Sequence, residues 1–213
     1  MFSAATAAAF LNGLSRFALL FLFVFYFQGV KGDDPITAGL KLAPMAIGML
    51  ISSPIGGVWA DRDGSRALAA VGMIVSAGAL AGMTTLEVHS GYWLSVLWLG
   101  IVGIGSGMFN SPNTAAMMGT VPPQRRGIAG GARTMLQNTG AVISIAFVLA
   151  IITAAVPKQT LFQIFSGLAS NLTEERLSPF IRNMHTALWV LAATSMIGAV
   201  VCLLRPAHVK EPA

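Results

Sequence analysis

Six long apolar runs, separated by short polar segments, dominate the sequence. A hydrocarbon core about 30 Å thick is crossed by roughly 20 helical residues, and every run reaches that length. Backbone groups in lipid must be hydrogen-bonded within their own segment, and the runs lack the alternation of barrel strands, so each run is predicted to be a transmembrane helix. The predicted spans are Ala5–Gln28, Pro35–Ala60, Ser65–Leu86, Tyr92–Met118, Arg126–Ala155 and Met184–Leu204.

This pattern predicts an all-α integral membrane domain over residues 1–206, followed by a short tail over residues 207–213. Composition agrees, because 55% hydrophobic and 10% charged residues leave too little polar surface for a soluble domain of 213 residues. The lipid bilayer is therefore the first expected partner. The net charge of +5 is spread along the chain without a basic face, which argues against nucleic-acid binding.

Basic residues gather in the segments that follow the even-numbered spans. Six crossings place these segments on one side of the membrane. Cytoplasmic loops carry the excess of Lys and Arg, so this side is predicted to be the cytoplasm, and both termini lie there as well. The residues concerned are Arg62, Arg66, Arg125, Arg126, Arg205 and Lys210.

The longest segment on the opposite side runs over residues 158–181 and has mixed charge. Its apolar positions recur near helical spacing, which predicts a short amphipathic helix lying on the outer membrane surface. These positions are Leu161, Phe162, Ile164, Phe165 and Leu168.

Arg16 is a charged residue well inside the first span, with Asn12 one helical turn before it. The two side chains share a face, and an unpaired Arg in lipid is costly, so we expect both to face a water-filled cavity that admits substrate. The alternative is that Arg16 extends to the inner surface or bonds a neighbouring carbonyl group.

The fifth span carries a polar stripe at alternating steps of three and four residues, which places its members on one helix face. Arg133 and Gln137 lie in this stripe and are candidates for lining a cavity. Polar glue between helices is the equally weighted alternative. The stripe consists of Arg126, Gly130, Arg133, Gln137, Gly140 and Ser144.

Three pairs of glycines have the small-xxx-small spacing that lets helices approach closely, which indicates a tightly packed bundle. Prolines in the second and fourth spans remove backbone hydrogen bonds and permit kinks. The segment 110–113 around Pro112 is expected to be such a kink rather than a ligand site. The glycine pairs are Gly78 with Gly82, Gly103 with Gly107, and Gly127 with Gly131.

The eight acidic residues all fall in loops, at helix ends or in the tail. A membrane-embedded proton or sodium relay needs a carboxylate at mid-membrane, and this chain has none there. The lone cysteine, Cys202, excludes an intrachain disulfide and a cysteine-based metal site. With no nucleophile–base cluster and no phosphate-binding loop, the sequence predicts no catalytic residue, metal ion or cofactor, and hence no enzyme.

The segment Gly57–Arg66 joins two predicted spans through a very short charged turn. It resembles the loop signature of the major facilitator superfamily, G-x-x-x-D-R/K-x-G-x-R/K, although Ala67 stands where a further basic residue is often found. Residues 26–44 resemble the opening of the second half of fourteen-helix drug:proton antiporters. Residues 122–140 resemble the loop and helix later in that same half.

The resemblance implies two three-helix inverted repeats that together form the C-terminal half of such a transporter, in the inner membrane of a bacterium. The implied partners are a missing N-terminal half or a second copy of the chain. The implied ligand is a small amphipathic or drug-like molecule, moved by alternating access. The alternative function is a non-transporting membrane scaffold or accessory subunit.

The resemblance also assigns Gly57, Asp61, Arg62, Gly64 and Arg66 to a conformational latch at the cytoplasmic face. Asp61 is expected to cap the following helix, where the helix dipole favours an anion. Arg62 or Arg66 is expected to pair with a neighbouring helix. The alternative is a plain turn whose arginines only set the topology.

Overall fold

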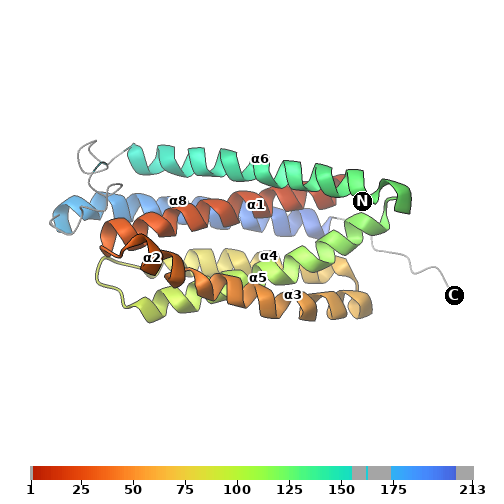
Figure 1. Cartoon of the computed structure of the whole chain (residues 1–213), viewed down its shortest axis with the longest axis horizontal. Helices are drawn as coiled ribbons and strands as arrows, with labels where there is room; N and C mark the ends of the chain where they lie inside the picture. Colours follow the sequence, from red (N-terminus) through yellow and green to blue (C-terminus); the bar gives the residue numbers. More distant parts are fainter. Residues whose placement is uncertain (1, 155–161, 163–173, 205–213) are drawn as a thin grey trace.

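A computed structural model describes residues 2–154, 162 and 174–204, and its regular structure is helical throughout these residues (Figure 1). Six of its helical segments are long and apolar enough to cross a membrane, as predicted. The helices are α1 (Phe2–Phe25) with a π-helical turn (Tyr26–Val30), α2 (Pro35–Lys41), α3 (Ala43–Asp63), α4 (Ser65–Gly82) with a 3-10 turn (Met83–Thr85), α5 (Tyr92–Gly119), a 3-10 turn (Pro123–Arg125), α6 (Arg126–Thr153) and α8 (Glu174–Leu203).

The second span was predicted as one helix, and it is two. α2 begins at the cap residue Asp34, whose Oδ1 accepts hydrogen bonds from the backbone N–H groups of Ile36 and Thr37. The chain turns at Leu42, and α3 starts there because Pro44 has no N–H to continue the preceding helix. Both pieces still form one membrane crossing, over Pro35–Ala60.

The sixth span begins earlier than predicted. α8 starts at Glu174 instead of Met184, and its early residues Leu177 and Phe180 are buried in the bundle. Residues 174–181, the last part of the segment 158–181, therefore form the first turns of α8 and pack against other helices, and the short surface helix expected at Leu161–Leu168 stays a prediction. The remainder of that segment, apart from Phe162, and the tail 207–213 lie outside the described residues.

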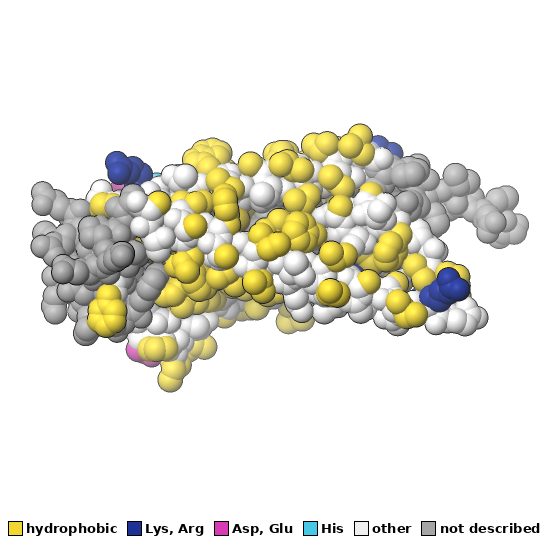
Figure 2. Space-filling model, turned by 90° about the horizontal axis from the view of Figure 1, so that it is seen from above, with side chains coloured by type: hydrophobic (Ala, Val, Ile, Leu, Met, Phe, Trp, Pro, Cys, Tyr) yellow, Lys and Arg dark blue, Asp and Glu magenta, His cyan; other side chains and the backbone are white. Residues whose placement is uncertain are grey.

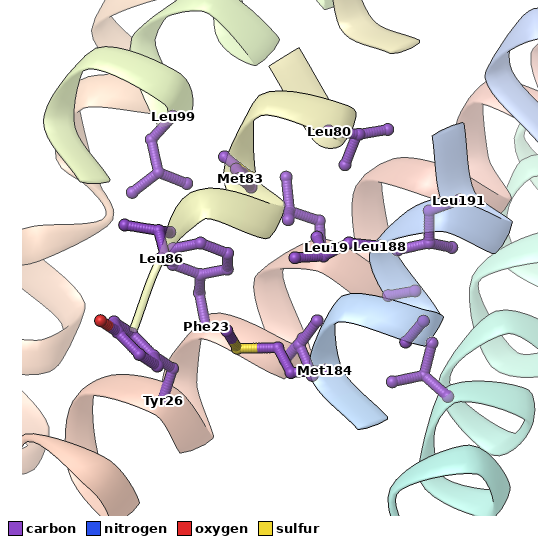
Figure 3. Packing of buried hydrophobic residues seen from close by; sticks show 14 of the residues in the cluster. Leu19, Phe23, Tyr26, Leu80, Met83, Leu86, Leu99, Met184, Leu188 and Leu191 are labelled. Carbon is purple, nitrogen blue, oxygen red and sulfur yellow. The ribbon is translucent and has the colours of Figure 1, made fainter. Parts of the chain in front are cut away.

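The bundle has a central group of four helices, α1, α4, α5 and α8, with α6 and α3 on its two flanks (Figure 1). Leu19 and Phe23 of α1 lie in one buried cluster with Leu80 of α4, Leu99 of α5 and Leu188 of α8 (Figure 3). Lipid tails are as apolar as these side chains, so close packing is the main force that holds the helices together.

The contacts between helices repeat when the first three spans are exchanged for the last three. α1 packs along α6 and α8, as α5 packs along α3 and α4. The exchange replaces α1 by α5, α3 by α6 and α4 by α8. It therefore maps the contact of α4 with α8 onto itself, and likewise the contact of α1 with α5. Each unit has three crossings, so the second unit enters from the opposite side. The fold is therefore two inverted three-helix repeats, as predicted.

Glycines allow backbone-to-backbone contact where the paired helices cross. A Cβ atom on Gly48 of α3 would lie 2.5 Å from the carbonyl oxygen of Gly100 on α5. Gly103 abuts the backbone of Met45 in the same way, and Gly72 of α4 abuts Gly105 of α5. Of the three predicted glycine pairs, the pair Gly103 and Gly107 lies at such a contact. Open space faces Gly78, Gly127 and Gly131, while Gly82 contacts Trp98.

The face seen in Figure 2 carries hydrophobic side chains along the middle of the bundle, and its Lys and Arg side chains lie near the two ends. α3 and α6 are the least buried spans. In the most apolar stretch of each, 22% and 28% of the residues are buried, against 44–50% in the other four spans. We call the end that holds the N-terminus and the α3–α4 and α5–α6 turns the inner end, and the opposite end the outer end (Figure 1).

Candidate functional site

Four helices line an open cavity of about 650 Å³, and most of its lining residues have polar side chains. α1 and α6 supply its two arginines, α6 and α5 its amide side chains, and α5 most of its hydroxyl groups, while α3 completes the wall. The lining residues are Arg16, Met49, Ser53, Asn110, Ser111, Thr114, Ala115, Arg133 and Gln137. The structure therefore brings together three of the four predicted cavity residues: Arg16, Arg133 and Gln137.

Arg16 lies at the middle of its span, fourteen residues from both Phe2 and Val30. At 1.5 Å per residue this depth is about 21 Å from either end, too far for the guanidinium group to reach the surface. Its Nη1 atom lies 3.5 Å from the sulfur of Met49, and the group lies 4.7 Å from the centre of the Phe17 ring. Its Nε atom is buried and has no hydrogen-bond partner. Arg16 also lines a second cavity of about 290 Å³ between α1 and the α2–α3 span.

Arg133 projects from α6 toward α5. Its Nη2 atom donates a 3.1 Å hydrogen bond to Oδ1 of Asn110. The amide of Asn110 is held in turn, because its Nδ2 donates to the carbonyl oxygen of Ser106 at 3.0 Å. The Nε atom of Arg133 is buried without a partner. Asn110 therefore fixes the position of one guanidinium nitrogen and leaves the buried Nε donor unpaired.

Gln137 lies where α6 approaches α1 most closely. A Cβ atom on Gly13 would meet its backbone oxygen at 2.9 Å, and Gly140 is as close to Phe10. The polar stripe of α6 thus faces α1 over its second half, where Ser144 is also buried. Arg126, at the start of the stripe, is exposed. The stripe therefore has two parts. Arg133 and Gln137 line the cavity, whereas Gly140 and Ser144 lie at the contact with neighbouring helices.

Asn12 lies elsewhere, and its expected place beside Arg16 in the cavity needs correction. Its side chain is buried against α4, where Nδ2 lies 3.5 Å from the sulfur of Met73. Four residues along a helix turn the side chain by about 400°, so two positions one turn apart differ by roughly 40° around the axis. This rotation directs Arg16 toward the cavity and Asn12 toward α4.

Asn110, Ser53 and Thr114 are cavity residues that the sequence did not assign. Segment 110–113 was expected to be a kink, and Pro112 does lie inside α5. Asn110 nevertheless enters the cavity, while Asn113 is buried and donates to the backbone oxygen of Ala5 on α1. The sequence feature that could have identified these α5 residues is that Asn110 and Thr114 are polar and lie four positions apart in a largely apolar span, which places them on one helix face.

The predicted latch forms the turn between α3 and α4. Gly64 has φ +92°, a conformation that favours glycine, and its N–H donates to the carbonyl oxygen of Ala60 at 3.0 Å. Gly57 faces α5, where an added Cβ would meet Oγ of Ser111 at 3.1 Å. Arg66 is exposed at the start of α4. Asp61 and Arg62 lie in the last turn of α3, and Gly64 rather than Asp61 is the N-cap residue of α4, so the expected cap position needs correction. The side chains of Asp61 and Arg62 are not described, so the latch interactions of Asp61 and the ion pair stay predictions.

Hydrogen bonds and an ion pair connect polar side chains at the outer end. The Nζ atom of Lys31 donates to the backbone oxygens of Val88 and Ser90 at 2.7 and 2.6 Å. Lys41 forms a 2.6 Å ion pair with Asp33. Burial lowers the pKa of Lys31, the charge of Lys41 lowers it further, and Asp33 acts in the opposite direction.

Comparison with known proteins gives the family. A family model described as Major Facilitator Superfamily matches residues 5–213. The chain is 31% identical over 153 residues to a tetracenomycin C resistance and export protein of Streptomyces glaucescens, covering 72% of this chain and 28% of that protein. It is 24% identical to a riboflavin transporter of Clostridioides difficile, covering 87% and 38%. It is 23% identical to a multidrug transporter protein of Bacillus subtilis, covering 95% and 36%. The chain thus spans less than two fifths of the length of these relatives.

Proposed function

Because the chain belongs to the major facilitator superfamily, we propose that it forms the C-terminal half of a fourteen-helix drug:proton antiporter. In this proposal the six-helix bundle rocks against a second half and moves a small amphipathic or drug-like molecule out of the cell. The membrane is the inner membrane of a bacterium, with both termini in the cytoplasm. The similarity to the tetracenomycin C resistance and export protein of Streptomyces glaucescens supports the outward direction.

The cavity is the observation that carries the proposal. It extends from the middle of the spans, at Arg16 and Gln137, toward the inner end of α5, at Thr114, and a polar wall within a span is costly unless it serves a pathway. Its walls come from α1, α3, α5 and α6, two helices of each inverted repeat. Transporters built from such repeats hold their substrate near the midplane at the repeat interface.

The second half would rest on α3 and α6. These two spans flank the bundle and are its least buried, so a partner that contacts both would also cover the cavity between them. No carboxylate is among the described residues of the cavity wall. A carboxylate for proton coupling would therefore come from the second half. That half is either an N-terminal segment of the same protein or a second copy of this chain.

The test is flux through the assembled transporter. The chain joined to its second half is reconstituted in proteoliposomes, and the efflux of anionic, neutral and cationic amphipathic dyes is followed by fluorescence. We expect efflux from the joined halves and none from the chain alone. Normal assembly with no flux of any dye would favour the scaffold function instead.

The latch is tested in the same assay with Asp61→Asn. A carboxylate that reaches from the last turn of α3 to the start of α4 would gain about 0.3–1 kcal/mol of dipole stabilisation there, so its loss should lower flux roughly two- to fivefold without loss of membrane insertion. Asp63→Asn is the comparison, because Asp63 lies closer to the start of α4 but at a variable position of the signature. A fall in flux in both variants would indicate the helix dipole alone, and a fall in Asp61→Asn alone would indicate the latch. Equal flux in the two variants would leave Asp61 with no role in the latch.

A further inference from the structure

Arg16 and Arg133 place two guanidinium groups on the wall of one cavity. They come from different helices and repel each other electrostatically. The other described wall residues are Met, Ala, Ser, Thr, Asn and Gln, so none of them neutralises either charge. Two positive charges at this depth are costly without a counter-charge.

The contacts that the two arginines do make are with neutral groups. Arg16 meets the sulfur of Met49 and the ring of Phe17, and Arg133 meets the amide oxygen of Asn110. Each keeps a buried Nε–H without an acceptor. Asn110 holds Arg133 in position without removing its charge. The cavity thus offers guanidinium donors to an anionic acceptor that its described wall does not contain.

We propose that the cavity binds a carboxylate-type oxyanion between Arg16 and Arg133, an inference that rests on the proposed function. Guanidinium groups bind planar carboxylates through paired N–H donors, and such charge-assisted hydrogen bonds are strong in a site of low dielectric. A cationic group would meet two like charges here. The anion has two sources: an acidic substrate, or an Asp or Glu side chain of the second half.

The test compares three probes that share one ring system and differ in charge: 1-naphthoate, neutral 1-naphthalenemethanol and 1-naphthylmethylammonium. Binding to the purified chain in lipid nanodiscs is measured by calorimetry. A hydrogen-bonded charge pair is worth about 1.5–3 kcal/mol, so naphthoate should bind at least about tenfold more tightly than the ammonium probe. Equal affinity for the three probes, or preference for the ammonium probe, overturns the proposal.

Variants locate the site. Arg16→Gln and Arg133→Gln should each weaken naphthoate binding by at least about tenfold and leave binding of the neutral probe unchanged. Arg125→Gln removes the same charge from an exposed position at the inner end and should leave the preference intact. Arg16→Lys and Arg133→Lys keep the charge without the planar fork. They should retain the order of preference with weaker naphthoate binding, and they provide the test if a Gln variant fails to fold.

Repeating the titration with the joined halves separates the two sources. If naphthoate still binds, the substrate supplies the anion. If naphthoate is excluded and both Gln variants lower the thermal stability of the joined halves, a carboxylate of the second half supplies it. Exclusion of naphthoate with both variants as stable as the unchanged protein overturns the proposal. Dye flux through the joined halves together with equal binding of the three probes to the chain alone overturns the anion site only. Preferential binding of naphthoate to the chain alone together with no dye flux through the joined halves overturns transport only.

Discussion

Gly72 and Gly78 lie on the same helix, α4, and differ in what surrounds them. A Cβ atom on Gly72 would lie 2.6 Å from the carbonyl oxygen of Gly105 and 2.8 Å from the backbone nitrogen of Phe109, both on α5. A Cβ atom on Gly78 would meet nothing within 4 Å. The substitutions Gly72→Ala and Gly78→Ala therefore add the same methyl group to the same helix, once into a helix contact and once into open space.

The difference between the two variants isolates the cost of the contact. Ordinary contact begins at 3.4 Å, so α4 must move about 0.8 Å from α5 to accept Ala at position 72. Overpacking costs about 1–3 kcal/mol, and the upper part of that range applies because the obstacle is backbone instead of a flexible side chain. Both variants gain about 0.5–1 kcal/mol of helix propensity, which cancels in the difference. We expect Gly72→Ala to be about 2–3 kcal/mol less stable than Gly78→Ala.

The assay is reversible unfolding of the purified chain by SDS in mixed micelles, followed by tryptophan fluorescence and circular dichroism. Gly78→Ala should be as stable as the unchanged chain or slightly more stable, and Gly72→Ala should unfold at lower SDS. Equal stability of the two variants would refute the contact between α4 and α5. A loss in Gly78→Ala would show that open space is not what surrounds that glycine.

Three further predictions concern topology, a turn and pH. Single cysteines at Ser65 and His89, in a Cys-free background, should label from opposite sides of the membrane, and labelling from one side would contradict the order of the spans. Gly64→Ala should cost about 1–2 kcal/mol in the SDS assay, because an L-residue is strained at φ +92°; an unchanged midpoint would exclude that strain. Burial lowers the pKa of Lys31 below its ordinary 10.5, so the folded chain binds fewer protons than the unfolded chain just below that pH. The contribution of Lys31 to stability should rise with pH through this window, and Lys31→Gln should remove that slope; an unchanged slope would exclude Lys31 as its source.

The helices were predictable because the membrane imposes a length and a composition that can be read directly from the chain. The ends of the helices were less predictable. The break at Leu42 depends on which of several prolines in the second span interrupts the helix. Pro44 does so near the start of α3, whereas Pro54 lies inside α3, which continues through it. The early start of α8 depends on burial of Leu177, and a tertiary contact of this kind leaves no mark on local hydropathy.

Glycine spacing shows the same limit. Gly103 and Gly107 have the predicted spacing and lie at a helix contact, but Gly78, with the same spacing to Gly82, faces open space. Contacts between α4 and α5 depend instead on Gly72 and Gly105. The spacing requirement tells which glycines share a face. It does not tell which face meets a neighbour, because that depends on the rotation of each helix in the bundle.

The candidate site combines both kinds of information. Arg16 was identifiable because a charge in the middle of an apolar span is costly on its own. Arg133 was predictable only as a member of a polar stripe, and Asn110 only as part of a kink, because the role of each depends on a neighbour on another helix. The hydrogen bond between them orients Arg133 toward the space that Arg16 also borders. Contacts with neutral groups alone leave the two guanidinium charges of the described cavity wall unbalanced, and this imbalance is the reason that we propose an anion site there.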